Sequence, residues 1–181
     1  MVALCFTNHW RKHYVHFENG GRNENSIYGD TDLKGASQVH KSAFVRQQRS
    51  YEWLRCNLNA SPRFLNFVAE SNGEIVGYII WVQKSGFRSE AVLELEQLAV
   101  SPKSQGQGIG RMLIKKSLPL VKEQLSSQDS VLKHILVTTR SDNFAQKLYQ
   151  STLGAQVETT ISNLYSADEV LMIARNVSVR T

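Results

Sequence analysis

Two glutamates in an apolar segment are the first residues whose type and spacing could do chemistry. Glu94 and Glu96 stand two positions apart, so on a strand both side chains point to the same face. A carboxylate that lines a cleft can take a proton from a substrate group and act as a general base. The alternative is that one or both carboxylates line a solvated strand face. We treat both glutamates as candidate catalytic residues.

A glycine-rich segment follows the same stretch of chain. Residues 93–100 are expected to form the end of a strand, residues 101–105 a loop, and Gly106, Gly108 and Gly110 the start of a helix. Glycines let backbone N–H groups approach a ligand closely, and a helix N-terminus carries unpaired donors and partial positive charge. The segment therefore predicts a pyrophosphate site, to which Lys103 and Arg111 could add charge.

Two other phosphate-binding motifs do not fit this segment. A P-loop closes with Gly-Lys-Ser/Thr, whereas Gly110 is followed by Arg111 and Met112. A dinucleotide-binding turn needs G-x-G-x-x-G directly after a strand, and Arg111 stands where its third glycine would be. Nucleoside triphosphate hydrolysis and dinucleotide binding are therefore not indicated.

At this point the chain resembles the GNAT superfamily of acyl-CoA N-acyltransferases. The family signature Gln/Arg-x-x-Gly-x-Gly/Ala matches Gln105-Gly-Gln-Gly108-Ile-Gly110, and the preceding strand end matches Leu98-Ala-Val100-Ser-Pro102. A second family pattern matches Asp142-Asn-Phe-Ala145-Gln-Lys-Leu148-Tyr149, followed by Gly154. This second segment departs from the family in two ways: Asp142 takes the usual Asn position, with Asn143 beside it, and the gap to Gly154 is one residue longer.

The resemblance implies an acetyl-CoA-dependent N-acetyltransferase that moves an acetyl group to a primary amine by direct transfer in a ternary complex. It implies that Glu94 or Glu96 is the base and that Tyr149 gives a proton to the leaving thiolate; the alternative for Tyr149 is packing of its ring. A strand bulge near Leu98 to Val100 would offer backbone groups to the oxyanion and the pantetheine arm. The implied cofactor-binding residues are Leu98, Ala99, Val100, Gln105, Gly106, Gln107, Gly108, Ile109, Gly110, Arg111, Asp142 and Asn143.

The acceptor is not fixed by these residues. We expect a small-molecule amine, and the alternatives are a protein or peptide amine, or an acyl-CoA sensor without turnover. Acetyl-CoA and the acceptor amine are the expected partners, a homodimer is possible because dimers are frequent in the family, and no metal is expected.

The elements that must position these residues alternate between two periodicities. Helices are predicted over residues 32–44, 48–58, 108–125 and 142–152, and strands over residues 64–70, 74–83, 90–100, 131–139, 156–161 and 169–176. Asn72-Gly73 predicts a hairpin, and Pro119 should kink or divide the third helix. This order indicates an α/β or α+β fold, and the resemblance implies a mixed, mostly antiparallel sheet flanked by helices on both faces.

Composition and charge limit the number of domains and the kinds of partner that the chain can have. The 181 residues suit one domain, which we place at residues 26–181 after an extension of residues 1–25, and the net charge of +5 suits an anionic partner. No block of five or six basic residues indicates nucleic-acid binding.

We expect a cytoplasmic protein without a signal peptide or membrane span. Cys5 and Cys56 have no metal or disulfide spacing. His9, His13 and His16 could share a helical face and bind a metal, although a packing arm or a poorly ordered terminus is the simpler interpretation.

Overall fold

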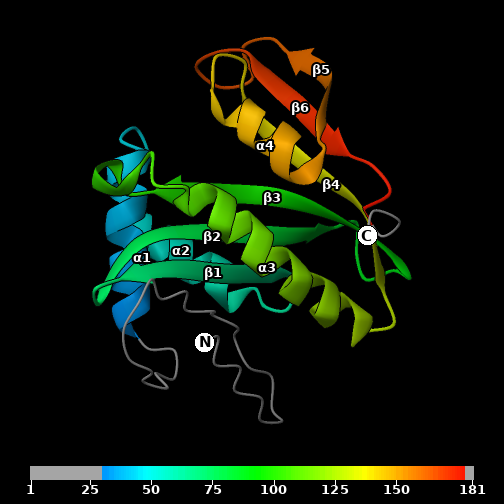
Figure 1. The fold of residues 1–181 in the computed structure, drawn as a ribbon, viewed down its shortest axis with the longest axis horizontal. Helices are drawn as coiled ribbons and strands as arrows, with labels where there is room; N and C mark the ends of the chain where they lie inside the picture. The colour runs from blue at the N-terminus through cyan, green and yellow to red at the C-terminus, as the bar shows by residue number, and fades with distance from the viewer. Residues whose placement is uncertain (1–29, 178–181) are drawn as a thin grey trace. The chain divides into compact units, whose positions relative to one another are not determined.

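The computed structural model describes residues 30–177 (Figure 1). The extension of residues 1–25 and its three histidines lie outside the described residues. No described helix is long and apolar enough to cross a membrane.

Four α-helices and six strands match the predicted order. The helices are α1 (Asp30–Ala43), α2 (Ser50–Asn59), α3 (Ile109–Ser126) and α4 (Ala145–Leu153), with a short 3-10 helix, η1 (Pro102–Ser104). The strands are β1 (Phe64–Ser71), β2 (Glu74–Lys84), β3 (Glu90–Val100), β4 (Val131–Arg140), β5 (Gln156–Ile161) and β6 (Glu169–Ala174). The predicted bounds of β3 and β5 are reproduced, and the other elements shift by up to three residues at either end.

The six strands form one mixed sheet in the order β1-β2-β3-β4-β6-β5. Strand β3 pairs in parallel with β4, and β6 pairs antiparallel with both β4 and β5. The turn between β1 and β2 has φ of 53° at Asn72 and 78° at Gly73, the two left-handed residues that an Asn-Gly hairpin requires. The α/β fold class with a mostly antiparallel sheet is therefore confirmed.

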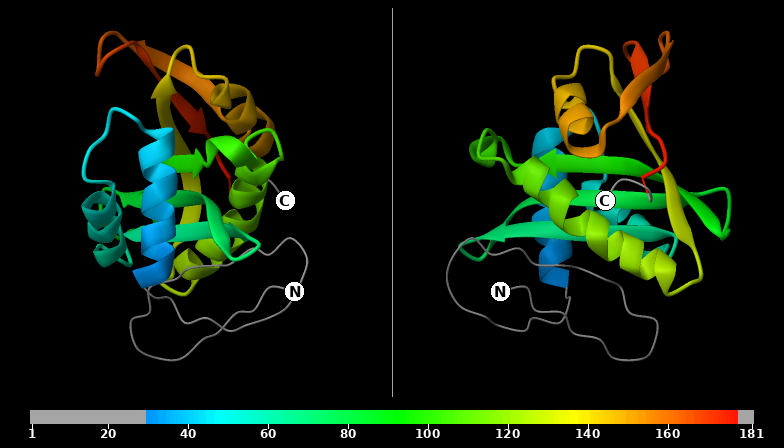
Figure 2. Two further views of the ribbon diagram at one scale, coloured as in Figure 1. Left: turned by 90° about the vertical axis from the view of Figure 1, so that its left-hand side faces the viewer. Right: turned by 45° about the vertical axis from the view of Figure 1, so that its right-hand side comes forward.

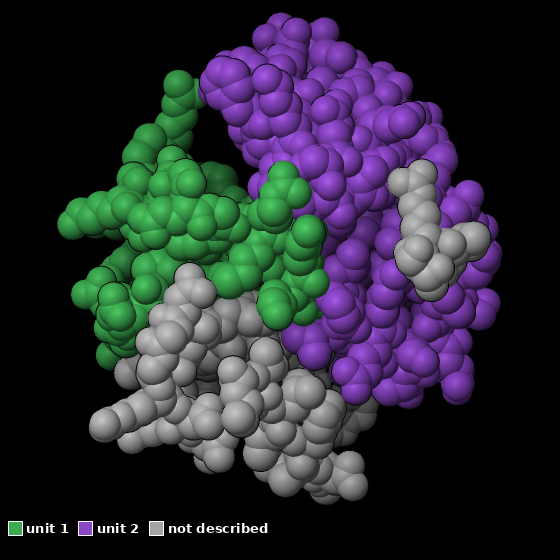
Figure 3. Space-filling model, in the orientation of Figure 1, with its two compact units in different colours: residues 1–80, 97–117 green, residues 81–96, 118–181 purple. Residues whose placement is uncertain are grey.

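The described residues divide into two compact units, which are treated separately below (Figure 3). The first unit comprises residues up to 80 and residues 97–117, and the second comprises residues 81–96 and 118 onward. Strands β2 and β3 and helix α3 contribute residues to both.

In the first unit, α1 and α2 lie side by side against the sheet (Figure 2). Leu33, Ala36 and Val39 recur on α1 at helical spacing and are buried, which explains why this segment is a helix with one apolar side. Their cluster is completed by Leu54 of α2, Val68 of β1, Tyr78 and Ile80 of β2 and Ala99 of β3.

A histidine is buried beside this cluster. The His40 side chain has no exposed surface, and its Nδ1 lies 2.9 Å from the Ser50 Oγ, which joins α1 to α2. Its ring lies 5.0 Å from the ring of Phe44 and 6.4 Å from that of Tyr78, measured between centroids. Burial lowers the pKa of His40, and the Gln47 side chain acts in the opposite direction. The ring is therefore neutral in the fold at physiological pH.

We expect His40→Gln to flatten the acid side of the stability profile. The unfolded His40 gains a proton near pH 6.5 whereas the folded ring resists it, so this contribution to stability is present above pH 6.5 and is lost as pH falls toward the lowered folded pKa. The glutamine variant does not take up this proton. Uptake of one proton by the unfolded chain alone changes the free energy of unfolding by at most about 1.4 kcal/mol per pH unit. Denaturant titrations between about pH 7 and pH 5 measure the difference; parallel profiles for the variant and wild type would contradict it.

In the second unit, the sheet has one buried and one half-exposed face. Residues Ile135, Val137 and Thr139 of β4 are buried opposite Ala174, Met172 and Val170 of β6. The alternate pairs on the other face are Leu136 with Ile173, Thr138 with Leu171 and Arg140 with Glu169. Because Leu136 is also in register with Glu94 of β3, the Glu94 carboxylate belongs to this second face.

One local feature differs from the predictions, and another stays untested. Helix α3 runs unbroken through Pro119, so the expectation that Pro119 divides this helix is wrong, and the alternative expectation of a kink stays a prediction. Pro119 is exposed, and water can bond the carbonyl that the proline ring leaves without a donor. The β3–β4 ladder is irregular between Ala91 and Val92 and ends at Glu94 and Leu136. The bulge expected near Leu98 to Val100 falls beyond that ladder and stays a prediction.

Candidate active site

The glycine loop of the first unit follows β3 without a gap. The Ser101 N–H donates to the Val76 carbonyl over 2.8 Å, which attaches the end of β3 to β2. The side-chain amide of Gln105 then donates back to the Val100 carbonyl over 3.2 Å. A similar bond of 3.5 Å runs from the Gln107 amide to the Lys103 carbonyl. Gln105 of the signature and Gln107 therefore both brace the loop in this conformation.

Glycine is required at two positions of this loop because of their backbone geometry. Gly106 has φ of 77° and Gly108 has φ of 79°, a region that L side chains rarely adopt. A Cβ built on either residue would meet no atom within 4 Å. Space beside the loop is therefore open at both glycines, as a site that receives a pyrophosphate needs.

Helix α3 begins directly after the second of these glycines. The first internal bond of the helix runs from the Met112 N–H to the Gly108 carbonyl over 3.0 Å. This pattern leaves the amides of Ile109 and Gly110 outside the helical ladder, at the positive end of the helix dipole. The loop and the helix start thus fit the phosphate group that the sequence predicts for them.

Gly77 of β2 is a site residue that the sequence analysis missed. A Cβ there would lie 3.0 Å from the Ala99 carbonyl oxygen and 3.2 Å from side-chain atoms of both Ile109 and Leu113. The missing side chain therefore lets the start of α3 sit close against β2 and the end of β3. A glycine inside an otherwise β-branched strand was the available signal for such a close approach.

We expect Gly108→Val to weaken acetyl-CoA binding by about tenfold or more. A β-branched residue at positive φ strains the loop by about 1–2 kcal/mol and redirects the amides that follow it. Gly86→Val is the matched control, because Gly86 also has positive φ and open space around it but lies in the β2–β3 connection. Calorimetric titration with acetyl-CoA measures both; equal affinities in the two variants would contradict the role of the loop.

The Glu94 carboxylate in the second unit has both oxygens engaged. The Lys84 ammonium lies 2.9 Å from Oε2, and the Thr138 hydroxyl donates to Oε1 over 3.3 Å. Glu96 lies two residues further along β3, is half-buried like Glu94, and shares its face in the alternating burial pattern. The structure therefore places the two carboxylates on one face as predicted, and it adds Lys84 as a partner that the sequence did not indicate.

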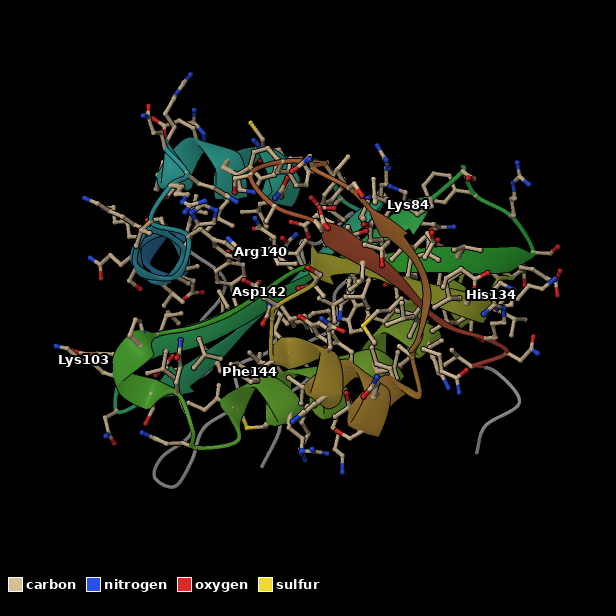
Figure 4. All side chains as sticks on the ribbon, turned by 90° about the horizontal axis from the view of Figure 1, so that it is seen from above. Lys84, Lys103, His134, Arg140, Asp142 and Phe144 are labelled. Carbon is tan, nitrogen blue, oxygen red and sulfur yellow. The ribbon has the colours of Figure 1, made fainter. Side chains whose placement is uncertain are left out.

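The same face carries a charged group at the end of β4. The Arg140 guanidinium binds both oxygens of Asp142, with distances of 3.0 Å from Nε and 2.7 Å from Nη2 (Figure 4). These bonds lower the pKa of Asp142. Glu169 faces Arg140 across the β4–β6 ladder and is only 7% exposed. Burial raises the pKa of Glu169, and the Arg140 charge acts against this rise.

The side chains of Asp142 and Asn143 both make hydrogen bonds to other residues of the fold. Asn143 donates from its amide to the Thr139 hydroxyl over 2.9 Å and accepts from the Ala145 N–H over 2.9 Å. The predicted start of this helix at residue 142 is wrong by three residues, because the helix begins at Ala145; the Asn143 side chain accepts from the amide of that first residue, and Phe144, the residue at the N-cap, makes no side-chain bond there. Their contact with a cofactor stays a prediction.

Tyr149 lies on α4 and is 6% exposed. Burial raises the pKa of its hydroxyl to about 12, so the group stays protonated at neutral pH. Within residues 30–177 the hydroxyl has no hydrogen-bond partner, whereas the other buried tyrosine of interest, Tyr78, donates to the Gln97 side chain over 3.1 Å. Tyr149 thus keeps a donor that the packing of the described residues does not use.

The predicted site residues are divided between the two compact units. The loop residues from Leu98 to Arg111 are brought together in the first unit, and Glu94, Glu96, Asp142, Asn143 and Tyr149 belong to the second. No group of three or more potential metal ligands occurs within the part of the chain that the structure describes.

Comparison with known proteins assigns this architecture to a family. The family model of the acetyltransferase (GNAT) family matches residues 34–155, which include the glycine loop, both glutamates and Tyr149. The chain therefore belongs to the GNAT acetyltransferase family, and it is an acyltransferase. The search of curated protein sequences returned no match.

Solved structures share the fold at low sequence identity. The ribosomal-protein-S18-alanine N-acetyltransferase from Escherichia coli is 24% identical with a TM-score of 0.62, over 83% of this chain and 92% of that one. An aminoglycoside 6'-N-acetyltransferase complexed with coenzyme A is 15% identical with a TM-score of 0.62, over 79% and 89%. Ard1 from Thermoplasma volcanium is 17% identical with a TM-score of 0.61, over 81% and 92%.

Proposed function

We propose that this protein transfers an acetyl group from acetyl-CoA to a primary amine of a small molecule, directly in a ternary complex. The observation that carries the proposal is the open glycine loop at the start of α3, where Gly106 and Gly108 adopt positive φ beside empty space. The family to which the chain belongs uses acetyl-CoA, and the residues present suit its pyrophosphate. A cytoplasmic location stays a prediction.

Acetyl-CoA supplies an activated thioester when it is bound. The amides of residues 106–110 would hold its pyrophosphate, while Lys103 and Arg111 add positive charge. The backbone of Leu98 to Val100 would pair with the pantetheine arm and offer a donor to the oxyanion. Asp142 and Asn143 would contact the cofactor only after exchanging their present partners, so their proposed part is small.

The acceptor amine must lose a proton before it can attack. An alkyl ammonium has a pKa of about 10.4, so only about one in 2,500 is neutral at pH 7, which corresponds to a deficit of roughly 4.6 kcal/mol. A positioned base offsets part of this deficit. We assign the base to Glu96, because protonation of Glu94 would break its ion pair with Lys84. Glu94 would then position Lys84 and Thr138 beside the acceptor.

Tyr149 is assigned to the departing sulfur. A thiol such as that of cysteine has a pKa of about 8.5, so its thiolate needs only modest stabilisation on leaving. The Tyr149 hydroxyl is protonated at neutral pH and has a donor to give. A hydrogen bond from this phenol, followed by proton transfer, would serve that purpose.

The acceptor class is tested by a panel. We would measure acetyl-CoA-dependent thiol release with aminoglycosides, polyamines, amino acids and peptides with free N-termini. Solved relatives in fold include an aminoglycoside enzyme and a ribosomal-protein enzyme, so both acceptor types belong in the panel. Light scattering of the same preparation would test for the homodimer.

Each outcome has a defined meaning. Release with a small amine supports the proposal, and release only with peptides would replace it by protein acetylation. Acetyl-CoA binding without release for any acceptor would favour a sensor without turnover. Failure to bind acetyl-CoA would refute all three.

A further inference from the structure

The net positive charge of the chain is concentrated between Lys34 of α1 and Arg63, the residue before β1; two aspartates, Asp30 and Asp32, precede this segment at the start of α1. Residues 34–63 contain six lysines and arginines but one acidic residue, Glu52, and so carry a net charge of +5. The rest of the chain holds 15 basic and 15 acidic residues and is neutral in sum. A charge excess this localised creates a field that attracts polyanions.

All six basic residues are exposed, and we call them the basic surface: Lys34, Lys41, Arg46, Arg49, Arg55 and Arg63. Lys34 and Lys41 lie two turns apart on α1, away from the face that packs on the sheet. Arg49 directly precedes α2. Figure 4 shows nitrogen-tipped side chains around both helices. No two of these six residues are adjacent in the sequence, so the fold assembles the basic surface from two helices and the segments that flank α2.

Aromatic and apolar side chains are interleaved with these cations. Trp53 lies one turn after Arg49 on α2 and is 44% exposed, and Val45 in the α1–α2 connection is 81% exposed. The guanidinium groups of Arg55 and Arg63 lie over the rings of Tyr51 and Phe64, at 5.8 Å and 5.5 Å from their centroids. An exposed indole among arginines is a surface on which nucleobases stack while cations hold phosphates.

We propose that the basic surface binds single-stranded nucleic acid. Four of its six cations are arginines, whose planar fork matches phosphate geometry, and Trp53 offers a π-face that an acidic peptide would not use. An unpaired strand exposes its bases for stacking, whereas a duplex does not. This binding is separate from acetyl transfer and does not depend on the proposed function.

The first test is the salt dependence of binding. Fluorescence anisotropy of the full chain with a labelled oligouridylate of about 20 nucleotides, at several salt concentrations, gives the slope of log K against log salt. Each phosphate contact contributes about −0.7 to this slope for single strands. The triple variant Lys34→Gln, Lys41→Gln and Arg49→Gln should lose about 2 units of slope. Its matched control, Lys115→Gln, Lys116→Gln and Lys147→Gln, removes the same charge from exposed positions of α3 and α4 and should retain the slope.

The second test isolates stacking. Trp53→Ala should weaken binding about tenfold at every salt concentration without changing the slope, because stacking contributes about 1–3 kcal/mol per base and involves no charge. Phe87→Ala is the control: Phe87 is 65% exposed but lies in the β2–β3 connection. Circular dichroism confirms that each variant is folded.

Four results would overturn the proposal. The first is that the wild-type chain does not bind the oligonucleotide, and the second is that the two triple variants lose the same amount of slope. The third is that polyglutamate of the same length binds as tightly as the oligonucleotide, and the fourth is that excess coenzyme A displaces the oligonucleotide. The third would indicate an acidic protein partner, and the fourth would place the binding at the cofactor loop. Acetyl transfer is measured in a separate experiment, so a failure to detect it would not change the result of the oligonucleotide-binding tests.

Discussion

Tyr149→Phe is expected to lower kcat about 100-fold and to leave the KM for acetyl-CoA within about threefold. The substitution removes only the hydroxyl, and a positioned proton donor contributes about 10²–10⁴-fold to the rates of reactions that need one. The ring of Tyr149 is buried in the second unit, so phenylalanine preserves its packing. Steady-state thiol release at saturating acceptor measures the effect.

The pH dependence of kcat distinguishes a proton-donor role of Tyr149 from a structural role. Burial raises the pKa of Tyr149 to about 12, so the donor is present below that pH and is lost only above it. The ratio of wild-type to variant kcat should therefore be constant from about pH 6 to pH 10.

Tyr78→Phe is the control for a buried tyrosine whose hydroxyl is already used. It removes the hydrogen bond to Gln97 and should cost about 1 kcal/mol of stability, with kcat little changed. Equal losses of kcat in the two variants would contradict the assignment of Tyr149 as the proton donor.

The order of the elements could be predicted from sequence because each has a strong local signal. Strand β3 alternates buried and half-exposed residues along its whole length, and α1 places Leu33, Ala36 and Val39 on one side. Asn72-Gly73 specifies its turn by backbone geometry alone. The family resemblance was carried by the glycine loop, whose geometry is also local, and the match of the family model confirms it.

What could not be predicted depends on contacts between segments far apart in the chain. The ion pair between Lys84 and Glu94 forms across the β2–β3 connection, and no sequence period indicates it. Gly77 is adjacent to the glycine loop only because β2 packs under Ile109 and Leu113. Helix α4 begins late because the Asn143 side chain bonds Thr139 and the Ala145 amide, a choice that depends on where β4 ends.

Glu96→Gln is expected to lower kcat/KM for the amine about 100-fold at pH 7, whereas Glu94→Gln should lower it less than tenfold. Glutamine keeps the size of the side chain but cannot accept the amine proton. Glu94 already binds Lys84 and Thr138, so its replacement disturbs positioning and leaves the proposed base in place. Thiol release at subsaturating acceptor, measured for both variants, compares the two glutamates directly.

The pH dependence of the Glu96→Gln defect distinguishes a base from a structural residue. As pH rises toward the amine pKa of about 10.4, a growing share of the acceptor is already neutral and the base contributes less. The deficit of the variant should therefore shrink steadily between about pH 7 and pH 10. The Glu94→Gln deficit should stay level over the same range, because it does not arise from proton removal. A larger and pH-dependent loss in Glu94→Gln would move the base to Glu94, and its ion pair with Lys84 would then have to open during each turnover.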